Sequence, residues 1–273
     1  MAARDPHRFV NELDDTAVNR LIERLESRAK DSVFTRLVDK YAQKLIAAKP
    51  ARVLEVGCGT GAMIRSFVSR HEFTGSAVGI DQSQSFIDAA ECYTQQEKLE
   101  AKLKFQLGDA HNLDFPDASF DAVIANTLIS HVTEPARVLQ EMARVLRHGG
   151  TLAIFDGDYA SLTYAYPEYE FGRNMDQALA VASFNNPRIM RELPYILRDY
   201  GLELYAAWGE AVVEIGKASY FKSFAETYAP YVVNAGLYSS KEVDTWLSLQ
   251  RDAMDKGTFF ASCNYYSYLM RIK

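Results

Sequence analysis

The chain has 273 residues, 48% of them hydrophobic, and a formal net charge of −6 at pH 7. This length and composition fit one large α/β domain or one domain with an insert, and the acidic balance argues against a nucleic-acid partner. Residues 1–8 lack the apolar core of a signal peptide, and no apolar run approaches the roughly 20 residues that cross a bilayer. The 3 cysteines are far apart and the 5 histidines are not at ligand spacing, so we expect a reduced, cytoplasmic protein without disulfides or a metal site.

The first half of the chain alternates between helical and strand patterns. Residues 14–48 carry apolar positions at helical spacing, and Pro50 ends that segment. Ser83 is expected to cap the helix that follows the second strand. We expect strands at about 51–56, 76–81, 103–107, 120–125 and 151–156, and helices at about 60–70, 83–99 and 134–147.

The second half of the chain is crowded with tyrosines. Residues 187–200 have a helical pattern that ends at Gly201, a good residue for a helix C-terminus. Residues 202–215 and 257–272 are expected to form a sixth and a seventh strand. Between these strands, residues 217–256 are expected to form a helical insert.

A glycine turn follows the first expected strand. The apolar run reaches Glu55 and then three alternating glycines, Gly57, Gly59 and Gly61, before a helix begins. Glycine is needed there because the backbone turns tightly and a ligand must approach where a Cβ would collide. Asp81 ends the next strand, where a carboxylate can accept both hydroxyls of a ribose. The sequence therefore predicts an adenosine-containing cofactor.

The spacing Gly57-x-Gly59-x-x-Ala62 also satisfies the dinucleotide fingerprint, so further segments must decide which cofactor is bound. Gly108-Asp109-Ala110 follows the third strand directly. The fourth strand ends in Asn126, and a helix then leads through a Gly-Gly turn into the fifth strand.

In combination these segments resemble the class I S-adenosylmethionine-dependent methyltransferases, particularly the small-molecule branch that includes the ubiquinone/menaquinone-type enzymes. The resemblance covers about residues 40–156. One departure is His148, which stands where the family usually has a proline before the Gly-Gly turn; it should alter the rigidity of the turn and not the choice of cofactor. The resemblance implies an α/β fold: a Rossmann-like, doubly wound, seven-stranded sheet whose last strand is antiparallel, with N-terminal helices and a helical lid insert.

The expected division of the chain has three parts. Residues 1–50 would form an N-terminal helical cap. Residues 51–216 and 257–273 would form the S-adenosylmethionine-binding Rossmann-like domain, and residues 217–256 a helical lid insert for the substrate.

The expected cofactor site draws on the strand ends. The glycine turn, with Cys58 as a small residue within it, would lie against the methionine and ribose portions, and Asp81 would take the ribose hydroxyls. Glu55 would orient the turn or meet the ligand's amino group through water, and Gln82 would lie along the adenine. The resemblance implies that Asp109 and the Ala110 N–H bind the adenine. The remaining expected contacts are Asn126 and Thr127 at the sulfonium and Arg28 at the carboxylate of S-adenosyl-L-methionine.

Methyl transfer needs a base only when the acceptor carries a proton at neutral pH. His131 follows the fourth strand at the expected mouth of the site and is the best catalytic candidate, although a structural role is an open alternative. Strand-end Asp156 and Asp158 could hold a hydroxylated or cationic substrate, or only cap the strand. Tyr159 and Tyr164 could form an aromatic wall for the substrate, or only pack.

The function indicated is S-adenosylmethionine-dependent methyl transfer to a small aromatic or polar metabolite in a biosynthetic pathway. A non-catalytic module that binds S-adenosylmethionine stays open as an alternative. A nicotinamide-dependent oxidoreductase is disfavoured, because no second mononucleotide half and no Tyr-x-x-x-Lys pattern follows the fourth strand. The sequence does not identify the acceptor atom of the methyl group. It is compatible with a homodimer, and it indicates no membrane-spanning segment.

Overall fold

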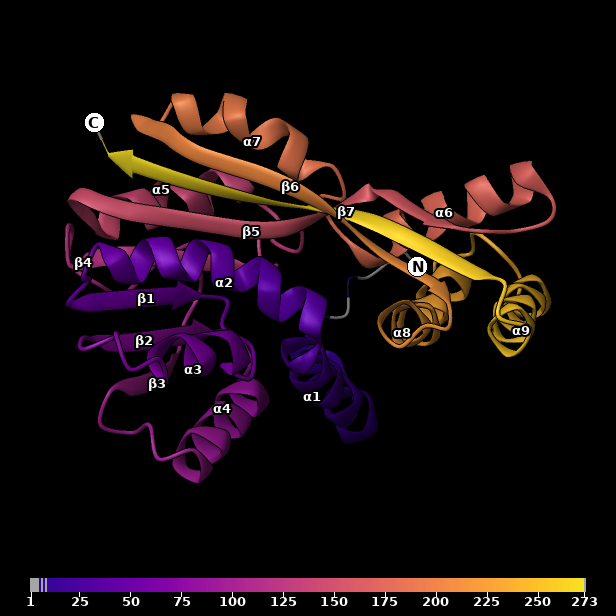
Figure 1. Cartoon of the computed structure of the whole chain (residues 1–273), viewed down its shortest axis with the longest axis horizontal. Helices are drawn as coiled ribbons and strands as arrows, with labels where there is room; N and C mark the ends of the chain where they lie inside the picture. The colour runs from indigo at the N-terminus through magenta and orange to yellow at the C-terminus, as the bar shows by residue number, and fades with distance from the viewer. Residues whose placement is uncertain (1–4, 6, 8, 273) are drawn as a thin grey trace.

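The computed structural model describes residues 5, 7 and 9–272 (Figure 1). Its centre is one seven-stranded sheet with the strand order β3-β2-β1-β4-β5-β7-β6. The first five strands pair in parallel, and β7 pairs antiparallel with both β5 and β6, which confirms the expected Rossmann-like sheet. The strands are β1 (Arg52–Val56), β2 (Ser76–Asp81), β3 (Leu103–Leu107), β4 (Phe120–Asn126), β5 (Leu146–Tyr164), β6 (Leu202–Gly216) and β7 (Phe259–Ile272).

Helices cover both faces of this sheet. On one face, α2 (Ser32–Ala47) and α3 (Ala62–Val68) share a core with the side chains of alternate strand residues such as Val53 and Ile124. On the other face, α5 (Pro135–Val145) and α7 (Ile189–Arg198) share a second core with the intervening residues, such as Leu54. Successive side chains of a strand point to opposite faces, so the near-continuous apolar runs of β1 and β4 fit burial from both sides.

The N-terminal helical pattern is divided into two helices. Asp31 separates α1 (Asp15–Lys30) from α2, and its carboxylate accepts hydrogen bonds from the N–H groups of Val33 at 2.8 Å and Phe34 at 3.4 Å. A carboxylate at this position caps the new helix and so favours a break in the old one. The short η1 (Val10–Glu12) precedes α1, which packs against α3 and α4 (Gln84–Gln96).

Ser83 caps α4 as expected, because its hydroxyl accepts a hydrogen bond from the Phe86 N–H at 3.3 Å. Gly201 also adopts the expected left-handed conformation after α7, with φ of +68°. Both are local signals that can be recognised without knowledge of the tertiary fold.

The fifth strand is much longer than the expected 151–156. Asp156, Gly157 and Asp158 look like a strand end, but they pair with Tyr266, Tyr265 and Asn264 of β7. β5, β6 and β7 therefore run on, beyond the other four strands, toward α6 (Tyr169–Ser183), α8 (Tyr220–Asn234) and α9 (Ser240–Asp255) (Figure 1). No helix was predicted from the sequence where α6 lies. Helical structure was predicted where α8 and α9 lie.

The extended β5 contains a bulge at residues 159–162. Asp158 faces Asn264 in the pairing with β7, and the next pair joins Thr163 to Ser262. Ser161 stabilises the bulge, because its hydroxyl donates to the Asp158 carbonyl at 2.6 Å and accepts from the Asn264 N–H at 2.8 Å. A bulge re-aims the side chains next to it.

The helices of the second half are part of the main core. Phe221 and Phe224 of α8 and Trp246 of α9 are buried in the core cluster that also contains α2 and the adjoining strands. Within the described residues, no helix is both long enough and apolar enough to span a membrane.

Candidate active site

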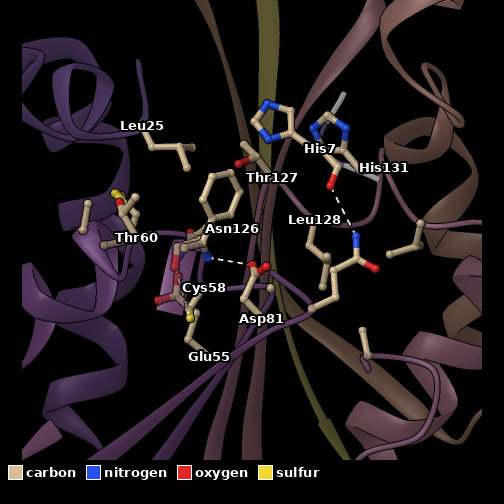
Figure 2. Close-up of a pocket in the computed structure, with 18 of the residues that line it drawn as sticks. His7, Leu25, Glu55, Cys58, Thr60, Asp81, Asn126, Thr127, Leu128 and His131 are labelled. Atoms are coloured by element: carbon tan, nitrogen blue, oxygen red, sulfur yellow. Dashed lines mark hydrogen bonds between the residues drawn. The ribbon is translucent and has the colours of Figure 1, made fainter. Parts of the chain in front are cut away.

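A cavity of about 350 Å³ lies beyond the carboxyl ends of β1, β2 and β4, with α1 and α8 contributing to its walls (Figure 2). Its volume falls in the range of small-molecule sites, and its position is where open α/β sheets bind ligands. Most of the expected site residues line it: Arg28, Glu55, Gly57, Cys58, Gly59, Asp81, Gln82, Asp109, Ala110, Asn126, Thr127, His131 and Tyr159.

The glycine turn is left-handed at all three glycines, with φ of +67°, +53° and +71° at Gly57, Gly59 and Gly61. A Cβ on Gly57 would lie 2.4 Å from the Leu128 Cδ1 atom. Gly61 does not line the cavity, and a Cβ there would lie 2.4 Å from the Phe105 Cζ atom of β3. The absence of a side chain at Gly61 therefore allows the turn to pack closely against β3.

Asp81 ties the glycine turn to the end of β2. Its carboxylate accepts hydrogen bonds from the Gly59 N–H at 2.8 Å and the Ser83 N–H at 3.0 Å. Burial raises the pKa of Asp81, and these backbone donors oppose that shift. An ionised carboxylate offers about four acceptor positions, so the backbone donors leave some acceptor capacity for a ligand.

Glu55 is buried, with 1% of its surface exposed, at the carboxyl end of β1. Its Oε1 atom accepts a hydrogen bond from the Asn126 Nδ2 atom at 2.6 Å, and the Tyr41 hydroxyl donates to the Asn126 Oδ1 atom at 2.5 Å. Glu55 Oε2 has no hydrogen-bond partner in the described part of the chain. Burial raises the pKa of Glu55 to about 8. A cationic or amine-bearing ligand would satisfy the unpartnered oxygen.

Arg28 and Thr127 come from distant segments and meet at the cavity. The Arg28 Nη2 atom donates to the Thr127 Oγ1 atom at 2.8 Å. Thr127 has φ of +48°, which is uncommon for a β-branched residue, and its N–H donates to the Phe155 carbonyl at 2.7 Å. Strained backbone of this kind concentrates at functional sites.

The loop after β3 brings Asp109 to the cavity. The Asp109 Oδ1 atom accepts a hydrogen bond from the His111 N–H at 2.9 Å. Partial burial raises the pKa of Asp109, but this hydrogen bond and the His111 ring lower it, and the net shift is downward. On the same side, Gln82 donates from its Nε2 atom to the His7 carbonyl at 3.2 Å. His7 thus lies against Gln82, which is expected to lie along the adenine, and no sequence pattern predicts this contact.

Two histidines lie side by side at the cavity, with ring centroids 4.7 Å apart (Figure 2). The His131 Nδ1 atom is 2.6 Å from the Asp5 Oδ2 atom, and the His7 Nε2 atom is 3.0 Å from the Tyr228 hydroxyl. Burial lowers the pKa of His131, but the charge of Asp5, its hydrogen bond and the charge of Asp156 together outweigh burial, and the net shift is upward. Burial, followed by the charge of His131, lowers the pKa of His7 well below its usual value. His131 therefore keeps its proton to a higher pH than His7 does.

Four further residues line the cavity that were not among the expected site residues, although α8 lies within the expected lid insert. They are Arg24 on α1 and Tyr220, Phe224 and Tyr228 on α8. One signal was available, because Arg24 precedes Arg28 by four residues and so lies on the same helix face. The α8 residues could not be assigned, because they are distant in sequence from every cofactor motif.

Three of the four expected substrate residues do not line the cavity. Asp156 is fully buried and accepts hydrogen bonds from Ser130 N–H at 3.0 Å and Gly157 N–H at 2.8 Å. Asp158 pairs with Arg191 at 2.8 Å. The Tyr164 hydroxyl donates to the Phe221 carbonyl at 2.9 Å. These side chains hold the extended β5 in place, and only Tyr159, beside the bulge, lines the cavity.

Comparison with known proteins agrees with this geometry. Residues 54–154 match the family model described as a methyltransferase domain. The phosphatidylethanolamine N-methyltransferase of Cereibacter sphaeroides is 42% identical over 109 residues, which are 40% of this chain and 52% of that protein. An uncharacterized 37.1 kDa protein of a Streptomyces fradiae transposon is 30% identical over 231 residues, or 83% of this chain and 65% of that protein. The chain thus spans between half and two thirds of the length of these relatives.

Solved structures share the fold. The [4+2]-cyclase SpnF has a TM-score of 0.57 and 22% identity, with 89% of this chain and 84% of that chain covered. A geranyl diphosphate C-methyltransferase from Streptomyces coelicolor, solved with S-adenosyl-L-homocysteine, has a TM-score of 0.54 and 15% identity, with 88% and 81% covered. Their different names illustrate that fold does not fix the reaction.

The strand order and the left-handed glycine turn define a Rossmann-like α/β fold, with an acidic residue at the end of β2. Residues 54–154, which match the family model, therefore carry a methyltransferase domain.

Proposed function

We propose that this protein transfers a methyl group from S-adenosyl-L-methionine to a small aromatic or polar metabolite of a biosynthetic pathway. The observation that carries the proposal is the unpartnered Oε2 atom of buried Glu55, beside a left-handed glycine turn. A buried carboxylate oxygen without a donor is costly, and the ammonium group of the cofactor would supply one.

The other residues of the cavity fit the remaining parts of the cofactor. Asp81 has acceptor positions left for ribose hydroxyls, and Asp109 with the Ala110 N–H suits the adenine edge. Arg28 offers a guanidinium to the carboxylate from its position beside Thr127. These assignments stay proposals for each residue.

The cofactor supplies a methyl group on a sulfonium, whose leaving group is a neutral thioether. The residues therefore need not stabilise a leaving anion, and alignment together with exclusion of water provides much of the rate. The buried aromatic side chains Tyr159, Phe224 and Tyr228 line the cavity and would exclude water there.

His131 is the proposed acid–base residue. Its Nδ1 atom is engaged by Asp5, which leaves the Nε2 atom for an acceptor. Because Asp5 raises the pKa of His131, the ring is better suited to orient the acceptor as a hydrogen-bond donor than to act as a base at neutral pH. His7, next to it, is a weak base, because burial and the charge of His131 hold its pKa well below the usual value.

Calorimetry with S-adenosyl-L-homocysteine and with NAD tests the cofactor assignment. We expect saturable binding of S-adenosyl-L-homocysteine and none of NAD. Tight binding of NAD with no response to S-adenosyl-L-homocysteine would overturn the proposal. A cytoplasmic location and a homodimer stay predictions from the sequence.

A further inference from the structure

Arg24 is a buried cation in an aromatic setting. Only 8% of the residue is exposed, although it lies on the N-terminal helix α1. Its guanidinium carbon is 5.3 Å from the ring centroids of Tyr220 and Phe224 and 5.1 Å from that of Tyr228. The Nη1 atom donates to the Ser223 hydroxyl at 2.9 Å. All four of these partners are on α8 and all are uncharged.

No carboxylate of the described residues forms an ion pair with Arg24. Arg65 provides the comparison within the same protein, because its side chain is also buried, at 3% exposure, and it pairs with both Glu26 and Glu97. A buried cation is costly unless an anion and further hydrogen bonds compensate it. Cation–π contacts compensate only part of that cost. Arg24 is therefore a position at which an anion from outside the chain would be stabilised.

The position of Arg24 separates it from the groups assigned to the cofactor. Glu55, Asp81 and Asp109 stand at the strand ends, and Arg28 joins that side through its hydrogen bond with Thr127. Arg24 is one helical turn earlier on α1 and faces the aromatic side chains of α8. One turn corresponds to roughly 5–6 Å along the helix, enough for the two guanidinium groups to bind different anions.

We propose that Arg24 binds a carboxylate group of the methyl acceptor, and that the acceptor is a small aromatic acid whose ring lies against the α8 side chains. The guanidinium fork matches a carboxylate with two parallel hydrogen bonds. Aromatic rings of Phe224 and Tyr228 offer faces and edges to a planar ligand. This inference rests on the proposed function and specifies the substrate class of that site.

The test uses the full-length protein saturated with S-adenosyl-L-homocysteine and two probes of the same shape, benzoate and neutral benzamide. Calorimetry or ligand-observed NMR gives both dissociation constants. We expect benzoate to bind at least about 10-fold more tightly than benzamide, the lower end of what a charge-assisted pair contributes. Equal affinities for the two probes would overturn the proposal.

Three variants locate the anion. Arg24→Met should weaken benzoate binding by about 10- to 100-fold and leave binding of S-adenosyl-L-homocysteine within about twofold. Arg28→Met should weaken S-adenosyl-L-homocysteine instead. Arg20→Met, at an exposed position of the same helix, should change neither and is the matched control. If Arg24→Met weakens S-adenosyl-L-homocysteine as strongly as benzoate, Arg24 serves the cofactor and the proposal fails.

Arg24→Lys keeps the charge and covers the case in which the methionine variant does not fold. It should retain a preference for benzoate over benzamide, at reduced affinity because the ammonium cannot form the bidentate pair; loss of that preference in a folded Arg24→Lys protein would overturn the proposal. Failure of the wild-type protein to bind S-adenosyl-L-homocysteine would instead count against the proposed function.

Discussion

Asp81 connects three parts of the site: the end of β2, the glycine turn and the start of α4. We predict that Asp81→Ala weakens cofactor binding by about 1–3 kcal/mol, because a charge-assisted hydrogen-bonding partner is lost. Calorimetric titration with S-adenosyl-L-homocysteine measures the effect. Asp81→Asn keeps the shape of the side chain and should fall between the wild type and the alanine variant. An unchanged dissociation constant in Asp81→Ala would assign the residue to capping alone.

Glu55 should make the stability of the ligand-free protein depend on pH. Its pKa is raised by burial from an ordinary 4.5 to about 8, so the folded state binds a proton that the unfolded state has released. The contribution of Glu55 is therefore fully present below about pH 4.5 and is lost as the pH rises toward about 8. Glu55→Gln cannot ionise and should gain stability relative to the wild type over that window. Denaturant unfolding of both proteins at pH 5 and pH 8 measures this, and a constant difference would contradict it.

The charge of Asp5 and its hydrogen bond raise the pKa of His131, and the charge of Asp156 adds to them. We predict that NMR titration of the His131 ring gives a pKa above 6.5 in the wild type and a lower one in Asp5→Asn. The stabilisation from this contact is present below pH 6.5 and is lost as the pH rises through the raised pKa. His7→Gln leaves Asp5 in place and serves as the control. A pKa that does not respond to Asp5→Asn would place the cause elsewhere.

The sequence could predict which strand-end residues line the cavity, because their signals are local. Each of Glu55, Asp81 and Asn126 lies at the carboxyl end of an apolar run, and parallel strands bring such ends to one edge of the sheet. Asp156 and Asp158 have the same local appearance. Their strand continues only because a segment about a hundred residues later pairs with it, which no local pattern can report.

At the scale of elements, the turn between β1 and α3 depends on both conformation and space. Gly61 has a left-handed backbone conformation. A Cβ on Gly61 would collide with the Phe105 ring, and a Cβ on Gly79 would collide with the same ring. We predict that Gly61→Ala destabilises the protein by about 2–4 kcal/mol, from about 1–2 for the left-handed backbone and the remainder from overpacking.

Gly149 provides the matched control, because it is left-handed with φ of +75° and has open space around the Cβ position. Gly149→Ala should therefore cost only the backbone part, about 1–2 kcal/mol. Thermal or denaturant unfolding compares the two variants. Equal losses would show that contact with Phe105 contributes nothing at Gly61.

Helix prediction succeeded where a boundary was encoded in the helix itself. Ser83 and Gly201 mark their helix ends through side-chain and backbone chemistry. Asp31 also carries such a signal, but it lies within a continuous apolar periodicity that suggested one helical segment. α6 follows an irregular, aromatic-rich stretch and gave no comparable start signal, since its cap is the carboxylate of Glu168.

At the scale of the whole molecule, α8 belongs to both the core and the cavity wall. Removing residues 217–256 would open the core, so single substitutions are the better test of their role in acceptor choice. We predict that Phe224→Leu changes the affinity for aromatic probes such as benzoate while binding of S-adenosyl-L-homocysteine persists, because Phe224 lines the cavity beside Arg24.

Phe221→Leu is the control for lost packing, since Phe221 is equally buried on α8 but does not line this cavity. Both variants should lose comparable stability, of about 1–2 kcal/mol for a partly refilled core position. An equal change in probe affinity in the two variants would mean that α8 acts only through stability.

The pairing of β6 with β7 continues from Leu202 to Gly216 and links the nucleotide-binding half to the half that carries α8. A hydrogen-bonded pair of strands of this length resists bending. The distance between the two walls of the cavity should therefore change little in the folded protein. Opening by a clamshell movement of the halves would strain that pair of strands throughout. We therefore expect ligands to exchange through local movements of side chains at the cavity and not through separation of the two halves.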